Sequence, residues 1–154
     1  MSQTEALQRA LQHSAAIKQE LDFSYGWLIQ ENIDADWVRN LDDITKERVS
    51  GFCSRFARFQ DYLADKLLRR WLEAAGERIG TAIENYAVAE RAGVLALPSE
   101  TMLELRSIRN QLSHEYQDDP AAFAQNLQTI LHATRGLAQT FDNLRAHSQR
   151  HLGV

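Results

Sequence analysis

Residues 49–71 read VSGFCSRFARFQDYLADKLLRRW, and large apolar side chains recur in this stretch at steps of three and four. Such steps place side chains on one face of an α-helix, whereas a half-buried strand requires alternation. The stretch therefore predicts a long helix that begins near Thr45 and ends at Gly76. Its buried stripe is expected to contain Val49, Phe52, Phe56, Phe59, Leu63, Leu67 and Trp71.

The sequence before this stretch predicts a second long helix, over residues 4–30, from the same periodicity. Its expected stripe consists of Leu7, Leu11, Ser14, Ile17, Leu21, Tyr25 and Leu28. Polar residues then interrupt the pattern at 32–36. A short turn follows around Trp37 and Val38, and either Asp34 or Asp36 could cap it.

The sequence after it predicts a third helix over residues 77–92, which Gly93 ends by adopting a left-handed conformation. Ile79, Ile83 and Tyr86 are its expected core residues. A fourth helix follows Pro98, with Ser99 as its expected cap.

The pair Asp119-Pro120 predicts the start of a fifth helix, since a capping acid followed by a first-turn proline favours helix initiation. Its expected stripe is Phe123, Leu127, Ile130, Thr134, Leu137, Phe141 and Leu144.

Composition agrees with an all-α fold of a single domain. The chain has 154 residues, 44% of them hydrophobic, with only 7 glycines and 2 prolines as helix breakers. We expect an up-and-down bundle of four to five helices over 1–154, with its core at about 4–146. The last residues, 147–154, are expected to form a flexible tail.

Charge and motif content exclude several classes of protein. The formal net charge of −4 excludes a strongly basic nucleic-acid coat, although a local basic patch is still possible. No apolar run reaches the ~20 residues that a membrane span needs, and the polar N-terminus is unlike a signal peptide. Cys53 is alone, which fits a reducing, cytoplasmic setting. Without metal-ligand spacing or a glycine-rich phosphate loop, we expect no metal and no cofactor.

The string Arg109-Asn110-Gln111-Leu112-Ser113-His114-Glu115-Tyr116 lies in the predicted fourth helix. At about 100° per residue, Leu105, Ile108 and Leu112 form the core stripe, with Tyr116 at its edge and Arg109 beside it. Asn110 and His114 fall on the opposite face, together with Leu103. This second face is expected to pack on another subunit.

The chemistry of this string suits phosphodiester cleavage. Histidine can take or give a proton near neutral pH, arginine binds phosphate oxygens with forked geometry, and asparagine can orient either. Without a carboxylate cluster, these residues favour metal-independent cleavage of RNA, in which the 2′-hydroxyl is the nucleophile. One histidine supplies half of the acid–base pair, so two apposed subunits would complete it. The ordinary alternative is a surface histidine and an arginine that lies along the apolar stripe.

The string also matches the Arg-x4-His-x-Tyr pattern, with asparagine directly after the arginine. An aromatic and basic helix precedes it at 55–63, and a glycine-ended helix at 89–94 leads into it. Over about 7–144, the chain resembles HEPN domain proteins of the HepT-like (HEPN/MNT toxin–antitoxin) family. The resemblance implies a bundle that dimerises through the motif helix, or forms a larger oligomer, with a ribonuclease centre in the dimer cleft.

The resemblance also implies residue roles. Arg109 would stabilise the scissile phosphate, His114 would be the general acid and base, and Asn110 would position them. Tyr116 would be AMPylated from ATP by a cognate MNT-type (minimal) nucleotidyltransferase, which acts as antitoxin. The bulky anion would then block phosphate entry at His114.

An RNA-cleaving surface should be locally positive, and several basic residues could provide that charge. These RNA-contact candidates are Arg55, Arg58, Lys66, Arg69, Arg70 and Arg106. They could equally be solvated charges of a helix face. Two other functions compete with the toxin-type ribonuclease. One is a non-catalytic HEPN subunit that binds substrate for a nucleotidyltransferase, and the other is a helical interaction module with a chance motif.

Overall fold

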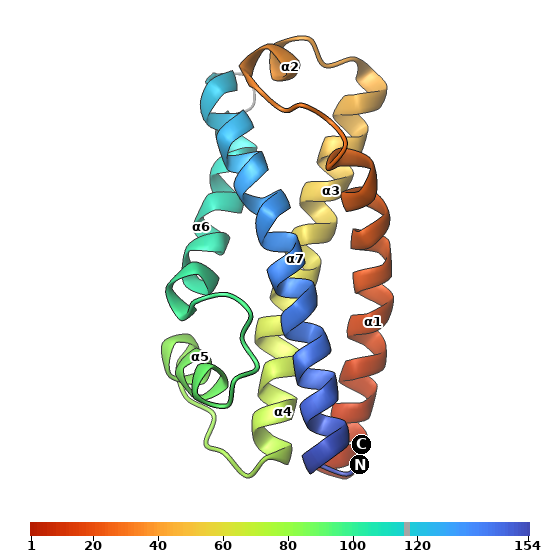
Figure 1. The fold of residues 1–154 in the computed structure, drawn as a ribbon, viewed down its shortest axis with the longest axis vertical. Coiled ribbons are helices and arrows are strands. Elements are labelled where there is room, and N and C mark those ends of the chain that lie inside the picture. Colours follow the sequence, from red (N-terminus) through yellow and green to blue (C-terminus); the bar gives the residue numbers. More distant parts are fainter. Residues whose placement is uncertain (116–117) are drawn as a thin grey trace.

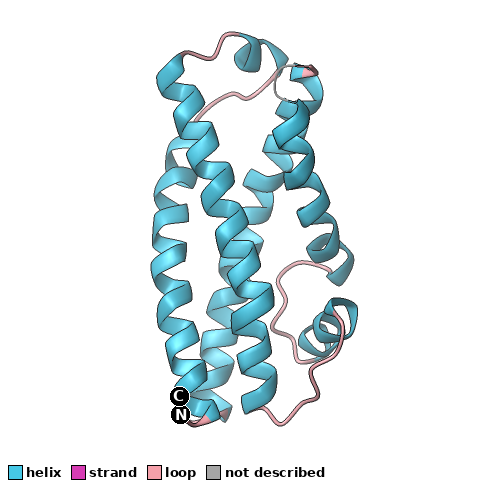
Figure 2. Ribbon diagram, turned by 180° about the vertical axis from the view of Figure 1, so that it is seen from behind, coloured by secondary structure: helices cyan, strands magenta, loops and turns pink. Residues whose placement is uncertain are grey.

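The computed structural model is an all-helical bundle and describes residues 1–115 and 118–154, without the side chains of 113–115. No strand occurs in this described part, and loops join the helices (Figure 2). The predicted all-α bundle is therefore confirmed. In order, the elements are α1 (Gln3–Leu28), α2 (Ala35–Arg39), α3 (Asp43–Tyr62), the π-helical turn η1 (Leu63–Leu67), α4 (Leu68–Ala74), α5 (Ala82–Arg91), α6 (Ser99–Glu115) and α7 (Pro120–His151).

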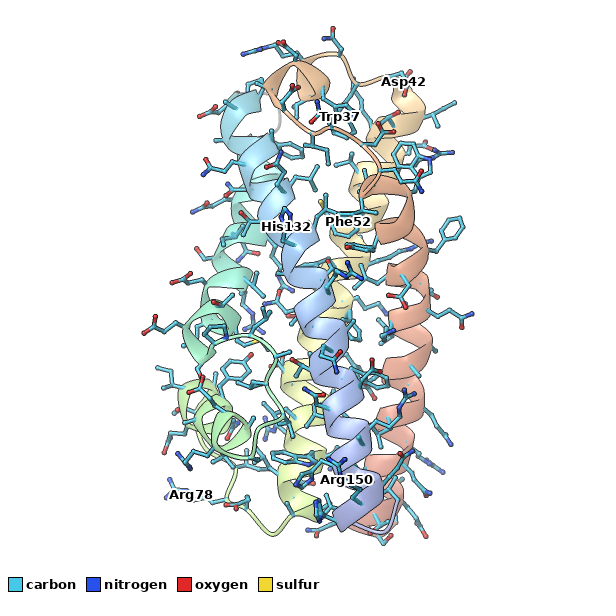
Figure 3. The ribbon with its side chains drawn as sticks, viewed as in Figure 1. Trp37, Asp42, Phe52, Arg78, His132 and Arg150 are labelled. Atoms are coloured by element: carbon cyan, nitrogen blue, oxygen red, sulfur yellow. The ribbon has the colours of Figure 1, made fainter. Side chains whose placement is uncertain are left out.

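Three long helical rods run side by side along the molecule: α1, the continuous helix α3–η1–α4, and α7 (Figure 1). The remaining side is built by α6, which packs on α7 and α3, and by α5, which packs on α6 and α4. The short α2 lies across one end of the bundle, and both chain termini lie at the other (Figure 1). Figure 3 shows Trp37 and Asp42 at the first end, and Arg78 and Arg150 at the second.

Aspartates cap several helices where the sequence places a break. The Asp34 carboxylate accepts a hydrogen bond from the Trp37 amide at 2.8 Å, so Asp34 rather than Asp36 caps α2. Asp42 caps α3 in the same way. At the start of α7, Asp119 accepts from the backbone N–H of Ala122, with Pro120 in the first turn as predicted.

The long apolar stripes are buried as predicted, except that Tyr25 in the stripe of α1 is only half-buried. Every stripe residue of α3–η1–α4 and of α7 is at most 3% exposed. The rings of Phe59 and Phe141 meet edge to face, with centroids 6.5 Å apart, and join the two helices. The π-helical turn lies where the stripe takes three successive steps of four residues, from Phe59 to Trp71. Steps of four drift around an α-helix, so a wider turn keeps this stripe on one face.

Three predicted features of the middle segment are wrong. Helix α5 begins at Ala82, five residues later than expected, because Thr81 and Glu84 form a capping box. Ile83, an expected core residue, is 64% exposed, whereas Tyr86 is buried. Ser99 is the first residue of α6 rather than its cap, and its buried hydroxyl has no hydrogen-bond partner among the described residues.

Helix α7 is longer than the sequence indicates. The helix continues to His151, past the expected start of a flexible tail at residue 147. Ser148 is fully buried, and the indole N–H of Trp71 donates to Nδ1 of His147 at 3.1 Å. In the described residues, no helix has the length and apolarity that a membrane crossing requires.

Candidate functional site

Helix α6 carries the motif and presents two faces. Leu105 and Leu112 are buried against the bundle, as the predicted core stripe requires. Leu103 is 38% exposed and Asn110 is exposed, so both lie on the predicted second face. The described part of the helix therefore follows the predicted arrangement.

Arg109 lies between α6 and α3. Its Nη1 donates to the backbone carbonyl of Ala57, and its Nη2 donates to Oδ1 of Asp61, both at 2.8 Å. The Arg109 side chain is only 13% exposed, while that of Asp61 is 45% exposed. Two contacts on one helix fix the orientation of the guanidinium, which has five N–H donors in total.

Arg106 extends this contact by one helical turn. Its Nη2 lies 3.2 Å from Oδ1 of Asp61 and 3.4 Å from Oδ2 of Asp65. Asp61 is therefore shared by both arginines. We call this group, Asp61, Asp65, Arg106 and Arg109, the α3–α6 ion-pair network.

Two predicted site residues lie outside what the structure describes. Nothing of Tyr116 is described, and of His114 only the backbone, which belongs to α6. His114 is five residues after Arg109 on the same helix, a rise of ~7.5 Å.

The predicted RNA contacts do not gather on one surface. Arg55 donates to the Ser24 hydroxyl at 2.7 Å and Arg58 pairs with Glu20 at 3.4 Å, so both reach toward α1. Arg70 pairs with Glu73 on its own helix, at 3.0 Å, and Lys66 is exposed on η1. Only Arg69 and Arg106 line the same cavity.

This cavity of about 170 Å³ lies beside the ion-pair network, between the α3–η1–α4 helix, α5 and α6. Its lining includes Gln60, Arg69, Asn85, Tyr86, Met102 and Arg106. The two arginines are exposed, whereas Gln60, Asn85, Tyr86 and Met102 are buried. The exposed carboxylate of Asp65 also lines the cavity, so a buried polar and apolar interior is combined with a charged rim of two arginines and one aspartate.

The polar side chains of this cavity differ in whether they form hydrogen bonds within the described residues. The Asn85 side-chain oxygen accepts a hydrogen bond from the Gly80 amide at 2.8 Å. Gln60 is 3% exposed, and its Oε1 has no hydrogen-bond partner among the described residues. Burial also raises the pKa of Tyr86, so its phenol stays protonated near neutral pH.

Sequence reasoning missed Gln60 and Asn85. Gln60 lies four residues after Phe56 and three before Leu63, which places a glutamine amide next to the apolar stripe. This spacing was the sequence signal that could have identified Gln60 as a buried amide. Asn85 had no such signal, because the start of α5 was misplaced.

The described residues give little support to a cysteine nucleophile or a metal site. Burial raises the pKa of the Cys53 thiol to about 12, so it is protonated at neutral pH and is a poor nucleophile. In the part of the chain that is described, no three histidine, cysteine or acidic residues form a group that could hold a metal ion. No family model, no curated protein and no solved structure matches the chain.

Proposed function

We propose that the chain is a HEPN toxin-type, metal-independent endoribonuclease of a two-component toxin–antitoxin module. It acts in the cytoplasm as a homodimer or a larger oligomer, and a cognate minimal nucleotidyltransferase neutralises it. The observation that carries the proposal is the string from Arg109 to Tyr116, which begins on one helix of an all-helical bundle.

The reaction needs one base, one acid and a stabilised phosphate. His114 of one subunit takes the proton from the 2′-hydroxyl, and the 2′-oxygen attacks the adjacent phosphorus. The bond from phosphorus to the 5′-oxygen breaks, and the second copy of His114 protonates this leaving oxygen. The products are a 2′,3′-cyclic phosphate and a free 5′-hydroxyl.

The setting of Arg109 suits a positioned phosphate ligand. Asp61 and the Ala57 carbonyl occupy one N–H on each terminal nitrogen, which leaves three guanidinium N–H groups for an anion. Holding the side chain in one orientation reduces the entropy that phosphate binding costs. In this proposal, Asp61 is a positioning residue.

The exposed face of α6 supports dimerisation through the motif helix. Leu103 and Asn110 are both exposed, and His114 falls on the same face of an ideal helix. An isologous interface across this face would bring the two copies of His114 into one cleft.

A cleavage assay tests the proposal. The purified chain with a chelator should cleave RNA, and His114→Ala or Arg109→Ala should abolish that activity. His132→Ala and Arg135→Ala, which change exposed residues of α7, are matched controls and should retain it. Equal survival of RNA with wild type and with both motif variants would defeat the nuclease proposal.

A separate assay tests the modification. Incubation with the cognate nucleotidyltransferase and ATP should add the mass of AMP to wild type and suppress cleavage. The Tyr116→Phe variant should stay unlabelled and active. Equal labelling of this variant would assign the modification to another residue.

One observation favours a second candidate, the non-catalytic substrate-binding subunit of a nucleotidyltransferase. Arg109 is mostly enclosed by contacts within its own chain, as expected of a structural arginine. In that case the purified chain would leave RNA intact and would raise the partner's nucleotidyl transfer to a third molecule.

A further inference from the structure

We propose that the cavity between the α3–η1–α4 helix, α5 and α6 binds one pyrimidine nucleotide, with the base inside and the phosphate at the rim. The inference rests on the proposed function, in which that nucleotide belongs to the RNA substrate. The cavity lies outside the Arg109-to-Tyr116 string, and it adds Gln60, Asn85 and Tyr86 to the residues that would contact RNA.

The size of the cavity selects a single ring. Its volume is about 170 Å³. A protein cavity of ~150 Å³ holds one benzene molecule. A pyrimidine base is a single six-membered ring, so it fits with little space left over, while a purine has a second fused ring.

The buried amide of Gln60 supplies hydrogen-bonding groups that would select a pyrimidine base. A buried acceptor without a partner destabilises a protein by ~1–3 kcal/mol, so a bound water or ligand next to the Gln60 amide would be stabilising. A glutamine side chain offers one acceptor and two donor hydrogens. The edge of a pyrimidine, which carries donors and acceptors side by side, is complementary to this amide.

The other walls suit the faces of a planar ring. Tyr86 is 6% exposed and Met102 is 2% exposed, and both line the cavity together with Leu68. An unstacked RNA base is commonly held between an aromatic and apolar side chains while its edge is hydrogen-bonded.

The rim supplies a site for the phosphate. Arg69 is exposed and forms no ion pair with any carboxylate in the described residues. Arg106, which comes from α6, is already paired with Asp61 and Asp65. We therefore assign the main phosphate contact to Arg69, with Arg106 as a weaker one.

The cavity also lies at a useful distance from the proposed catalytic residues. Arg106 precedes Arg109 by three residues and His114 by eight, which correspond to ~4.5 Å and ~12 Å along the axis of α6. A nucleotide held here would anchor the strand a short distance from the bond to be cleaved.

Direct binding to the full-length chain tests the proposal. Calorimetry would compare CMP and UMP with AMP and GMP, with cytidine and with ribose 5-phosphate. We expect a pyrimidine monophosphate to bind about tenfold more tightly than a purine monophosphate, cytidine or ribose 5-phosphate. Tighter binding of the purine nucleotides, or binding of ribose 5-phosphate equal to that of CMP, would overturn the proposal.

Two variants separate the base from the phosphate. Gln60→Met keeps the side-chain length but removes the amide, so it should weaken CMP binding about tenfold while its Tm equals or exceeds that of wild type. A Gln60→Met protein that loses Tm and retains binding would show a purely structural amide. Arg69→Ala should weaken CMP binding but leave cytidine unchanged, and Arg135→Ala is the control that should change neither.

Two further measurements show whether the bound nucleotide belongs to a nucleic-acid strand. They also separate failure of the pocket proposal from failure of the nuclease proposal. A short 2′-deoxy pyrimidine oligonucleotide, which cannot be cleaved, should bind more tightly than CMP if the site serves a strand. Binding no tighter than CMP would assign the pocket to a free nucleotide. His114→Ala should bind both ligands like wild type. A wild-type chain that binds them but cleaves no RNA would refute only the nuclease. Cleavage that Gln60→Met leaves unchanged, with unchanged binding, would refute only the pocket.

Discussion

The two sides of the bundle are built differently. On the side formed by α1, α3–η1–α4 and α7, buried positions are mostly apolar, and Phe56 and Leu137 are fully buried. On the side where α5 and α6 meet α3–η1–α4, polar groups are enclosed: Arg109 in an ion pair, and the Gln60 amide beside a cavity.

From this contrast we expect the apolar side to stabilise the bundle and the α5–α6 side to bind a ligand. Apolar packing stabilises the bundle, and a leucine at position 60 would extend it. A buried amide without a partner lowers the free energy of unfolding, so its presence marks the α5–α6 side as the place where a ligand is expected.

Truncation in the apolar side should have the largest effect. Phe56→Ala removes a fully buried ring that contacts Phe52, and should lower the free energy of unfolding by about 3–5 kcal/mol in urea titration. Ile83→Ala, which truncates a side chain that is 64% exposed on α5, should change it by less than about 0.5 kcal/mol. Comparable losses for the two variants would remove the contrast.

A substitution where α7 meets the loop between α5 and α6 should lower the free energy of unfolding by a smaller but measurable amount. A Cβ added at Gly136 on α7 would lie 2.4 Å from the Leu97 side chain, in the loop between α5 and α6. Gly136→Ala should therefore destabilise the protein by about 1–3 kcal/mol. Gly51→Ala, where nothing lies within 4 Å, should stabilise it by up to about 1 kcal/mol. Thermal unfolding of both variants measures the difference in sign.

The ion-pair network should contribute less, because Asp61 is 45% exposed. Asp61→Asn keeps an acceptor but removes the charge next to Arg109, and should lower the free energy of unfolding by about 1 kcal/mol. Asp22→Asn breaks an exposed pair with Lys18 and should lower it by no more than about 0.5 kcal/mol. Equal losses for the two variants would show that the burial of Arg109 does not strengthen its ion pair with Asp61.

The smallest effect is a pH dependence at the end of α7. Burial lowers the pKa of His147 from its ordinary value of 6.5, and the charges of His151 and Arg150 lower it further. Above pH 6.5 His147 is neutral in both states and its bond from Trp71 is intact. As the pH falls through 6.5, the unfolded state takes up a proton first, so the free energy of unfolding falls.

His147→Asn retains an acceptor that does not titrate. The difference in unfolding free energy between wild type and this variant should therefore be constant above pH 6.5 and should shrink at lower pH. A difference that is the same at pH 5.5 and pH 8 would contradict the assignment.

Much of the fold could be predicted from the sequence, because long helices repeat their signal many times. The stripes of α3–η1–α4 and α7 were predicted residue by residue, and Asp119-Pro120 marked the start of α7. The start of α5 was missed, since one or two side chains decide a boundary: here the reciprocal hydrogen bonds of Thr81 and Glu84.

The site was harder to predict than the fold. The faces of α6 followed from helical periodicity, but the partner of Arg109 did not, because Asp61 lies 48 residues away in the sequence. The cavity depends on three elements that meet only in the folded chain. Periodicity within one helix carries no information about such a meeting.

The π-helical turn at Leu63–Leu67 sets the rotation between the two halves of the long α3–η1–α4 helix. If the same residues were wound as an ordinary α-helix, everything beyond the turn would rotate by about 100° relative to the first half. Trp71 would then turn away from His147, and Arg69 would leave the cavity rim, without the loss of a single side chain at either site. Deletion of one residue within the turn would have the opposite outcome: the stripe would step by four, three and four, so an ordinary α-helix would keep both halves in phase. The turn thus accommodates one residue more than an α-helix holds over the same length.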